Sequence, residues 1–133
     1  MVQTLKLYKS ASKYYSKAIE IDSTYAEAYF SRGTLKLNEM QFDEAIADFD
    51  KALTIEPFMT FAIANRAFAR IRKYEFGGDR KLLENNEVTV LASKKKAEIS
   101  ESEKQKICND LEKAISLGDT VEMVLNAKEQ YCK

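Results

Sequence analysis

The residues of this 133-residue chain whose types and spacing could do chemistry are paired carboxylates, such as Asp43 with Glu44 and Asp48 with Asp50. Such pairs act as general acid and base when their surroundings separate their pKa values. The chain has no histidine, so the most common general base and metal ligand is missing. It also has no phosphate-binding loop and no nucleophile motif. We therefore expect no enzymatic activity and no cofactor, and we interpret these carboxylates as solvated helix positions.

Two cysteines, Cys108 and Cys132, are too few for a four-ligand zinc site, but they permit a disulfide. Cys108 falls near the start of one predicted helix and Cys132 near the end of the next. A turn at Gly118 makes these helices antiparallel, which brings the thiols together. A bridge closing about 25 residues would stabilise the fold by roughly 3 kcal/mol. The alternative is two free thiols, one of them buried between the helices.

The compartment follows from the state of these cysteines. A disulfide implies an oxidising location, so the protein would be periplasmic or secreted. Free thiols are compatible with a cytoplasmic location. The sequence leaves both alternatives open.

Charge and hydropathy argue against two classes of partner. The chain has 21 basic and 21 acidic residues, so no overall basic field favours nucleic acid or an anionic membrane. No apolar run approaches the roughly 20 residues that a membrane span requires. With 4 glycines and 1 proline, the composition favours long helices over sheet.

A short fragment, Lys-Ala followed by an aliphatic residue, recurs three times and decides how the chain is organised. Its alanines are Ala18, Ala52 and Ala114. The interval between the first two copies is about 34 residues, a period typical of a helical solenoid. The second interval is nearly twice as long, which predicts an insertion of about 28 residues before the last copy.

The second copy belongs to the most complete unit. Apolar and small residues recur at helical spacing through 26–37 and again through 42–55, with a short turn between them. Pro57 ends the second helix because proline cannot continue it. The unit therefore reads as helix, turn, helix, stop.

This unit, residues 26–59, resembles a tetratricopeptide repeat. The family pattern requires large, small, aromatic and proline residues at fixed positions, and the chain supplies Tyr29, Gly33, Ala45, Phe49, Ala52 and Pro57. The small residues let helix backbones approach, and the aromatic ring fills the remaining space. The overall run of motifs, with its Tyr131-Cys132-Lys133 end, is similar to bacterial members of the family.

The resemblance implies one all-α domain over residues 1–133, an α-solenoid of antiparallel helix pairs. Its expected parts are the second helix of a partial repeat (4–22), a complete repeat (26–59), a repeat interrupted at about 76–103 (60–119) and a capping helix (120–133).

The predicted insertion carries several local signals. Gly77-Gly78-Asp79 predicts a turn, Lys81 to Glu84 a helical turn, and Val88 to Leu91 an extended piece. We interpret the segment as a solvated loop, or as a lid or partner-specific contact. Acidic neighbours argue against a basic nucleic-acid loop at Ser93-Lys94-Lys95-Lys96. Ser100 with Glu103 predicts a capping box at the start of the next helix.

The resemblance also implies a concave face, lined by the first helix of each pair, on which a protein or peptide partner is held. The partner-binding positions are Phe30, Thr34, Leu37, Phe61, Asn65, Phe68 and Arg72. Exposed apolar residues usually mark a binding surface, although the insertion or capping helix would turn them into ordinary core. Only Asn65 falls on a position of the Lys/Asn clamp that holds peptide carboxylates, so we do not expect that clamp.

Two arginines, Arg32 and Arg66, recur at the same position of successive repeats. They either pair with acidic residues of neighbouring helices or meet an acidic ligand.

We expect a non-enzymatic module that binds a protein or peptide through the concave groove. The alternative is a structural segment of a larger protein. The half-repeat at 4–22 lacks its partner helix, which leaves apolar surface at that end. An upstream helix or a second copy of the chain, forming a homodimer, would cover it.

Overall fold

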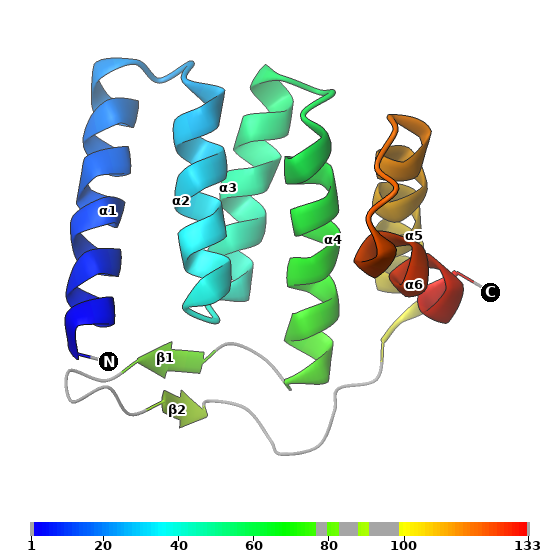
Figure 1. Cartoon of the computed structure of the whole chain (residues 1–133). Coiled ribbons are helices and arrows are strands. Elements are labelled where there is room, and N and C mark those ends of the chain that lie inside the picture. The colour runs from blue at the N-terminus through cyan, green and yellow to red at the C-terminus, as the bar shows by residue number, and fades with distance from the viewer. Residues whose placement is uncertain (1, 77–79, 83–87, 91–98, 133) are drawn as a thin grey trace.

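The computed structural model describes residues 2–76, 80–82, 88–90 and 99–132. The helices are α1 (Val2–Ile21), α2 (Ala26–Asn38), α3 (Phe42–Ile55), α4 (Thr60–Glu75), α5 (Glu101–Ser116) and α6 (Glu122–Tyr131), and the strands are β1 (Arg80–Leu82) and β2 (Val88–Val90). Successive helices run up and down beside one another (Figure 1). The expected all-α solenoid of antiparallel helix pairs is confirmed.

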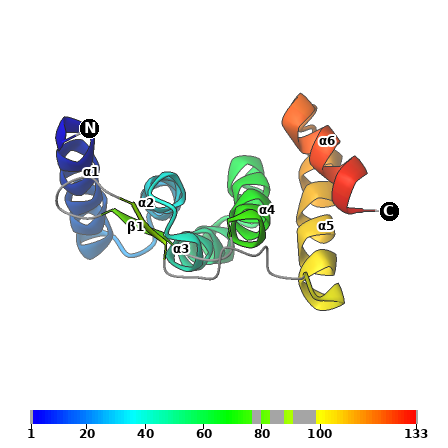
Figure 2. The same cartoon turned by 90° about the horizontal axis from the view of Figure 1, so that it is seen from below.

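The helices form two rows with the core between them. Seen from below, α2, α4 and α6 lie along one side of the molecule, and α3 and α5 lie along the other (Figure 2). The largest fully buried side chains come from both rows: Phe42, Phe49, Ile107, Leu111 and Val124.

Gly33 shows why the repeat pattern requires a small residue at its position. A Cβ atom on Gly33 would lie 2.8 Å from a ring carbon of Phe49 and 3.1 Å from the Cβ of Asp48. Both neighbours belong to α3, so α2 and α3 approach closely only because Gly33 has no side chain.

Two helices end in the same backbone motif with different residues. After α5, Gly118 has φ 102°, and the amides of Gly118 and Asp119 donate to the carbonyls of Ile115 and Ala114. After α2, Met40 has φ 62° and makes the matching bond to Leu37. The glycine signal therefore marks one of these two ends and misses the other.

The insertion departs from one expectation. Lys81 and Leu82 belong to β1, which pairs antiparallel with β2 through Arg80 with Val90, Lys81 with Thr89 and Leu82 with Val88. A helical turn at Lys81 to Glu84 is therefore wrong, because the β-branched residues of β2 offer this segment an extended partner. The expectations for Gly77-Gly78-Asp79, Leu83, Glu84, Leu91 and Ser93-Lys94-Lys95-Lys96 lie outside the described residues.

The described residues cover helix α1 on one side and leave its other side exposed. Ala45, Phe49 and Ala52 of α3 are fully buried. Their counterparts one repeat earlier, Ala11, Tyr15 and Ala18, are only half-buried. Three further apolar side chains of α1 are largely exposed: Leu7 at 68%, Tyr14 at 71% and Ile21 at 79%.

Candidate partner-binding face

One side of α4 carries four of the predicted partner-binding residues. Phe61, Asn65, Phe68 and Arg72 are spaced by four, three and four positions, which places them in one stripe along the helix. Phe61 is 67% exposed. The other three are half-buried, so they keep some surface available to a partner.

The predicted residues of α2 are placed differently from one another. The hydroxyl of Thr34 donates to the carbonyl of Phe30 at 2.9 Å, and its oxygen lies 3.5 Å from the side-chain nitrogen of Asn65. The ring of Phe30 lies 6.1 Å, centre to centre, from that of Phe49 in the core. Leu37 is only 6% exposed and belongs to the core. The α2 part of this face therefore consists mainly of Phe30 and Thr34.

A cleft of about 260 Å³ lies between α4 and α6. Its α4 wall is Phe68, Ile71, Arg72 and Glu75, and its α6 wall is Met123, Asn126, Ala127, Gln130 and Tyr131. The phenol of Tyr131 donates to a carboxylate oxygen of Glu75 at 3.1 Å and so bridges the two walls. Burial and the nearby Glu75 charge raise the pKa of Tyr131, so the phenol stays protonated as a donor at neutral pH.

The α6 wall was not among the predicted partner-binding residues. The shift along the chain that carries Ala52 onto Ala114 also carries Phe61, Ala64, Asn65 and Phe68 onto Met123, Asn126, Ala127 and Gln130. The interval between the last two repeat fragments therefore relates these α4 residues to the α6 wall. Adding that interval to the predicted groove positions of α4 would have identified the α6 wall from the sequence.

Arg72 lies between two clefts. Besides the α4–α6 cleft, it lines a second one of about 300 Å³ together with Leu37, Asn38, Met40, Phe42, Glu75 and Phe76. Within residues 7–76 and 99–132, the structure gives the Arg72 guanidinium no ion pair. A half-buried cation that has no carboxylate partner in these ranges is suited to an acidic or carbonyl group of a ligand.

The recurring arginines face the other side of the repeats and pair with aspartates. Arg32 donates from Nε and Nη2 to both oxygens of Asp48 at 2.9 and 2.8 Å. Arg66 does the same with Asp110 at 2.9 and 2.7 Å. The hydrogen bonds with Asp110 raise the pKa of Arg66 above its usual range. Pairing with neighbouring acidic residues is therefore confirmed, and these arginines stabilise the packing.

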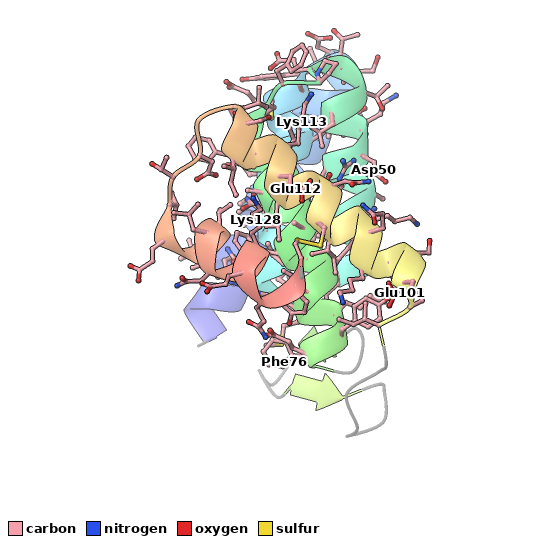
Figure 3. The ribbon with its side chains drawn as sticks, turned by 90° about the vertical axis from the view of Figure 1, so that its right-hand side faces the viewer. Asp50, Phe76, Glu101, Glu112, Lys113 and Lys128 are labelled. Carbon is pink, nitrogen blue, oxygen red and sulfur yellow. A yellow bond between two sulfur atoms is a disulfide. The ribbon has the colours of Figure 1, made fainter. Side chains whose placement is uncertain are left out.

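Cys108, in α5, and Cys132, directly after α6, form a disulfide, with their Cα atoms 5.4 Å apart. The bond is visible between the two helices in Figure 3. Both cysteines line a cleft of about 190 Å³ that is also lined by Glu101, Lys104, Gln105, Glu112 and Tyr131.

Two kinds of feature are absent from the described residues. None of the described helices is long and apolar enough to cross a membrane. No group of three or more His, Cys, Asp or Glu side chains in the described ranges could hold a metal ion.

Comparison with protein families gives two matches, both described as the tetratricopeptide repeat. One covers residues 26–59 and the other residues 3–25. A solved structure with the same arrangement is titled "Crystal structure of YrrB: a TPR protein with an unusual peptide-binding site". It aligns with 96% of this chain and 52% of its own at a TM-score of 0.63, and the 22% sequence identity limits the likeness to the fold.

Two curated proteins match part of the chain. The mitochondrial import receptor subunit TOM70 of Homo sapiens is 35% identical over 65 residues, 49% of this chain and 11% of its own length. The UDP-N-acetylglucosamine–peptide N-acetylglucosaminyltransferase of Giardia intestinalis is 35% identical over 57 residues, 43% of this chain and 4% of its own. The chain thus spans only a small part of the length of either relative.

Proposed function

Because the chain belongs to the tetratricopeptide repeat family, we propose that it is a protein–protein interaction module that binds a peptide segment along α2, α4 and α6. The contact residues are Phe30, Thr34, Phe61, Asn65, Phe68 and Arg72, joined by the α6 wall of the cleft.

The observation that carries this proposal is the α4–α6 cleft. Phe68 and Arg72 lie in one wall, and Met123, 57% exposed, lies in the other. Apolar surface beside a few polar groups is the composition of peptide-binding sites. Phe61 and Met123 keep large apolar side chains in solvent, where their burial by a partner would be favourable.

A selection from a displayed random-peptide library tests the proposal. Peptides enriched on the full chain are measured by fluorescence anisotropy against Phe61→Ala and Met123→Ala. We expect each substitution to weaken binding about tenfold or more, because each removes apolar area worth roughly 1.5–3 kcal/mol when buried.

Phe58→Ala is the matched control. Phe58 is also a phenylalanine that is 67% exposed, but it lies before α4 and its ring contacts the Lys113 ammonium at 5.1 Å. It should leave peptide binding unchanged. Equal losses for Phe58→Ala and Phe61→Ala, or no loss for Phe61→Ala and Met123→Ala, would refute the binding face.

Self-association through α1 is a second candidate function. Tyr14 stands where the two later repeats have Asp48 and Asp110, so the outer face of α1 carries an apolar ring instead of an arginine-binding carboxylate. Leu7 and Ile21 lie two helical turns before and two helical turns after Tyr14. A two-fold axis at Tyr14 would therefore set Leu7 of one copy against Ile21 of the other.

Sedimentation velocity over a wide concentration range tests this second candidate. The sedimentation coefficient of the wild type should rise with concentration, and Tyr14→Glu should abolish the rise. Tyr25→Glu is the control, because Tyr25 is 46% exposed and lies after α1. A coefficient that stays constant for the wild type would exclude self-association.

A further inference from the structure

Helix α6 is held by few buried side chains. Only Val124 is buried in it, while Met123 and Leu125 are 57% and 43% exposed. Leu125 takes the repeat position of Ile63, which is 3% exposed because its helix is covered by α5. No described helix covers α6 in the same way, so its apolar contacts with the rest of the chain are limited.

The disulfide lies where the earlier repeats use ion pairs. Lys36, Arg70 and Cys132 take the same position in three successive repeats. Lys36 binds Glu44 at 3.2 Å, and Arg70 binds Asp110 at 3.1 Å. These contacts tie a first helix to the second helix that follows it. Cys132 instead ties the end of α6 covalently to α5, the second helix that precedes it.

The same bond holds one wall of the peptide cleft. Tyr131 precedes Cys132 and lines the α4–α6 cleft, and its phenol reaches Glu75 across that cleft. If the end of α6 separates from α5, Tyr131 and the neighbouring residues Ala127 and Gln130 move with it. The cleft then loses its second wall.

The disulfide is accessible to a reductant. Cys108 is only 8% exposed, whereas Cys132 is half-buried, and both line the cleft of about 190 Å³ between α5 and α6. Figure 3 views this side of the molecule, with Glu101 and Glu112 labelled on α5 and Lys128 on α6. An incoming thiolate can therefore approach the sulfur of Cys132.

We infer that the Cys108–Cys132 disulfide is a redox switch for peptide binding at the α4–α6 cleft, an inference that rests on the proposed function. A dithiol reductant attacks Cys132 through one thiolate, forms a mixed disulfide with it, and displaces Cys108 as a thiolate that takes up a proton. The second thiol of the reductant then attacks the mixed disulfide and releases Cys132. Two electrons and two protons pass to the protein, the reductant becomes a disulfide, and α6 is released.

Hydrogen exchange of the full chain with and without dithiothreitol tests the structural half of this inference. Opening the cross-link should speed exchange of the α6 amides about 100-fold, because the disulfide no longer restricts the conformational entropy of the locally unfolded segment. The α2 and α3 amides should keep their rates, which shows that the remaining repeats stay folded. Cys108→Ser/Cys132→Ser should exchange like the reduced protein and should not respond to dithiothreitol. Unchanged α6 exchange on reduction would overturn the switch.

Peptide affinity in the two redox states tests the functional half. A library-selected peptide should bind the reduced chain at least tenfold more weakly than the oxidised chain. Equal affinity in both states, with Phe61→Ala still weakening binding, would overturn the switch and leave the proposed function intact. Failure of the oxidised chain to select any peptide would instead overturn the proposed function, and the switch with it.

Discussion

Arg66 on α4 and Asp110 on α5 form a two-point contact, in which Nε and Nη2 of the guanidinium lie 2.9 and 2.7 Å from the carboxylate oxygens. The third nitrogen of Arg66 donates to Asp50 on α3 at 2.8 Å. One side chain of a first helix thus joins the second helices of two successive repeats. In the preceding repeat, Arg32 joins Asp48 to Ser16 in the same way.

Replacement of Asp110 should be the most costly single change in this network. Its side chain is 9% exposed, and it also accepts from Arg70 at 3.1 Å. Asp110→Asn removes the buried carboxylate from two partly buried guanidinium groups, which keep only the more exposed Asp50 and Glu103, so we expect a loss of about 2–4 kcal/mol in the free energy of unfolding. Urea denaturation with an unchanged m-value measures this loss.

Asp50→Asn provides the comparison within the same network. The Asp50 side chain is 52% exposed, so solvent screens its pairing with Arg66 and the loss should stay below about 1 kcal/mol. If both variants lose the same stability, the buried two-point contact is not what distinguishes Asp110.

The two described glycines should respond to an added methyl group for different reasons. Gly33→Ala would bring a Cβ within 2.8 Å of Phe49, and we expect it to cost about 1–3 kcal/mol through overpacking. Gly118→Ala meets no atom within 4 Å, but its φ of 102° is unfavourable for alanine, so we expect a loss of about 1 kcal/mol.

A double variant separates these two causes. Phe49→Leu removes the ring edge that the new methyl group would meet, so Gly33→Ala should cost less in a Phe49→Leu background than in the wild type. Gly118→Ala should cost the same in both backgrounds, since Gly118 does not contact Phe49. Additive losses for Gly33→Ala and Phe49→Leu would contradict the close approach of α2 and α3.

The repeat positions were predictable from sequence because periodic packing constrains them. Gly33 and Phe49 touch, so their sizes are linked wherever the unit recurs. The conformation at Met40 was not predictable, because no residue type there indicates a positive φ. The strand pairing of Lys81 with Thr89 was also missed, since three-residue strands are too short to produce an alternating pattern.

The candidate site was predictable in part. The predicted positions of α4 fall in one stripe along the helix because the register of the complete repeat extends to them. Leu37 belongs to the core, although its helical position is the same kind as theirs. Whether Arg32 and Arg66 faced a ligand or an aspartate depended on the distance between helices, which residue types alone do not give.

The cost of a leucine-to-alanine substitution should differ between a buried and an exposed helix position. Leu111 is fully buried in α5, whereas Leu7 of α1 is 68% exposed. Leu111→Ala removes buried methyl groups and leaves a cavity, so we expect a loss of about 2–5 kcal/mol in unfolding free energy. Leu7→Ala should change stability by less than about 0.5 kcal/mol in the monomer. A loss above about 1 kcal/mol for Leu7→Ala in dilute protein would show that the outer face of α1 is covered.

The start of α5 offers a test of helix capping directly after the insertion. The hydroxyl oxygen of Ser100 accepts from the amide of Glu103 at 3.1 Å, which is one half of the predicted capping box. The Glu103 carboxylate instead contacts Lys106 at 3.3 Å and Arg70 at 3.8 Å. Only the serine half of the box is therefore seen in these contacts.

Ser100→Ala should cost about 1 kcal/mol in unfolding free energy, because the Glu103 amide loses its acceptor at the helix start. Ser100→Asp should retain most of the stability, since its carboxylate accepts the same bond and interacts favourably with the helix dipole. Ser102→Ala is the matched control, because Ser102 is an exposed serine of the first turn and lies inside the helix. Thermal and urea unfolding of the three variants measure the differences, and equal losses for Ser100→Ala and Ser102→Ala would contradict the cap.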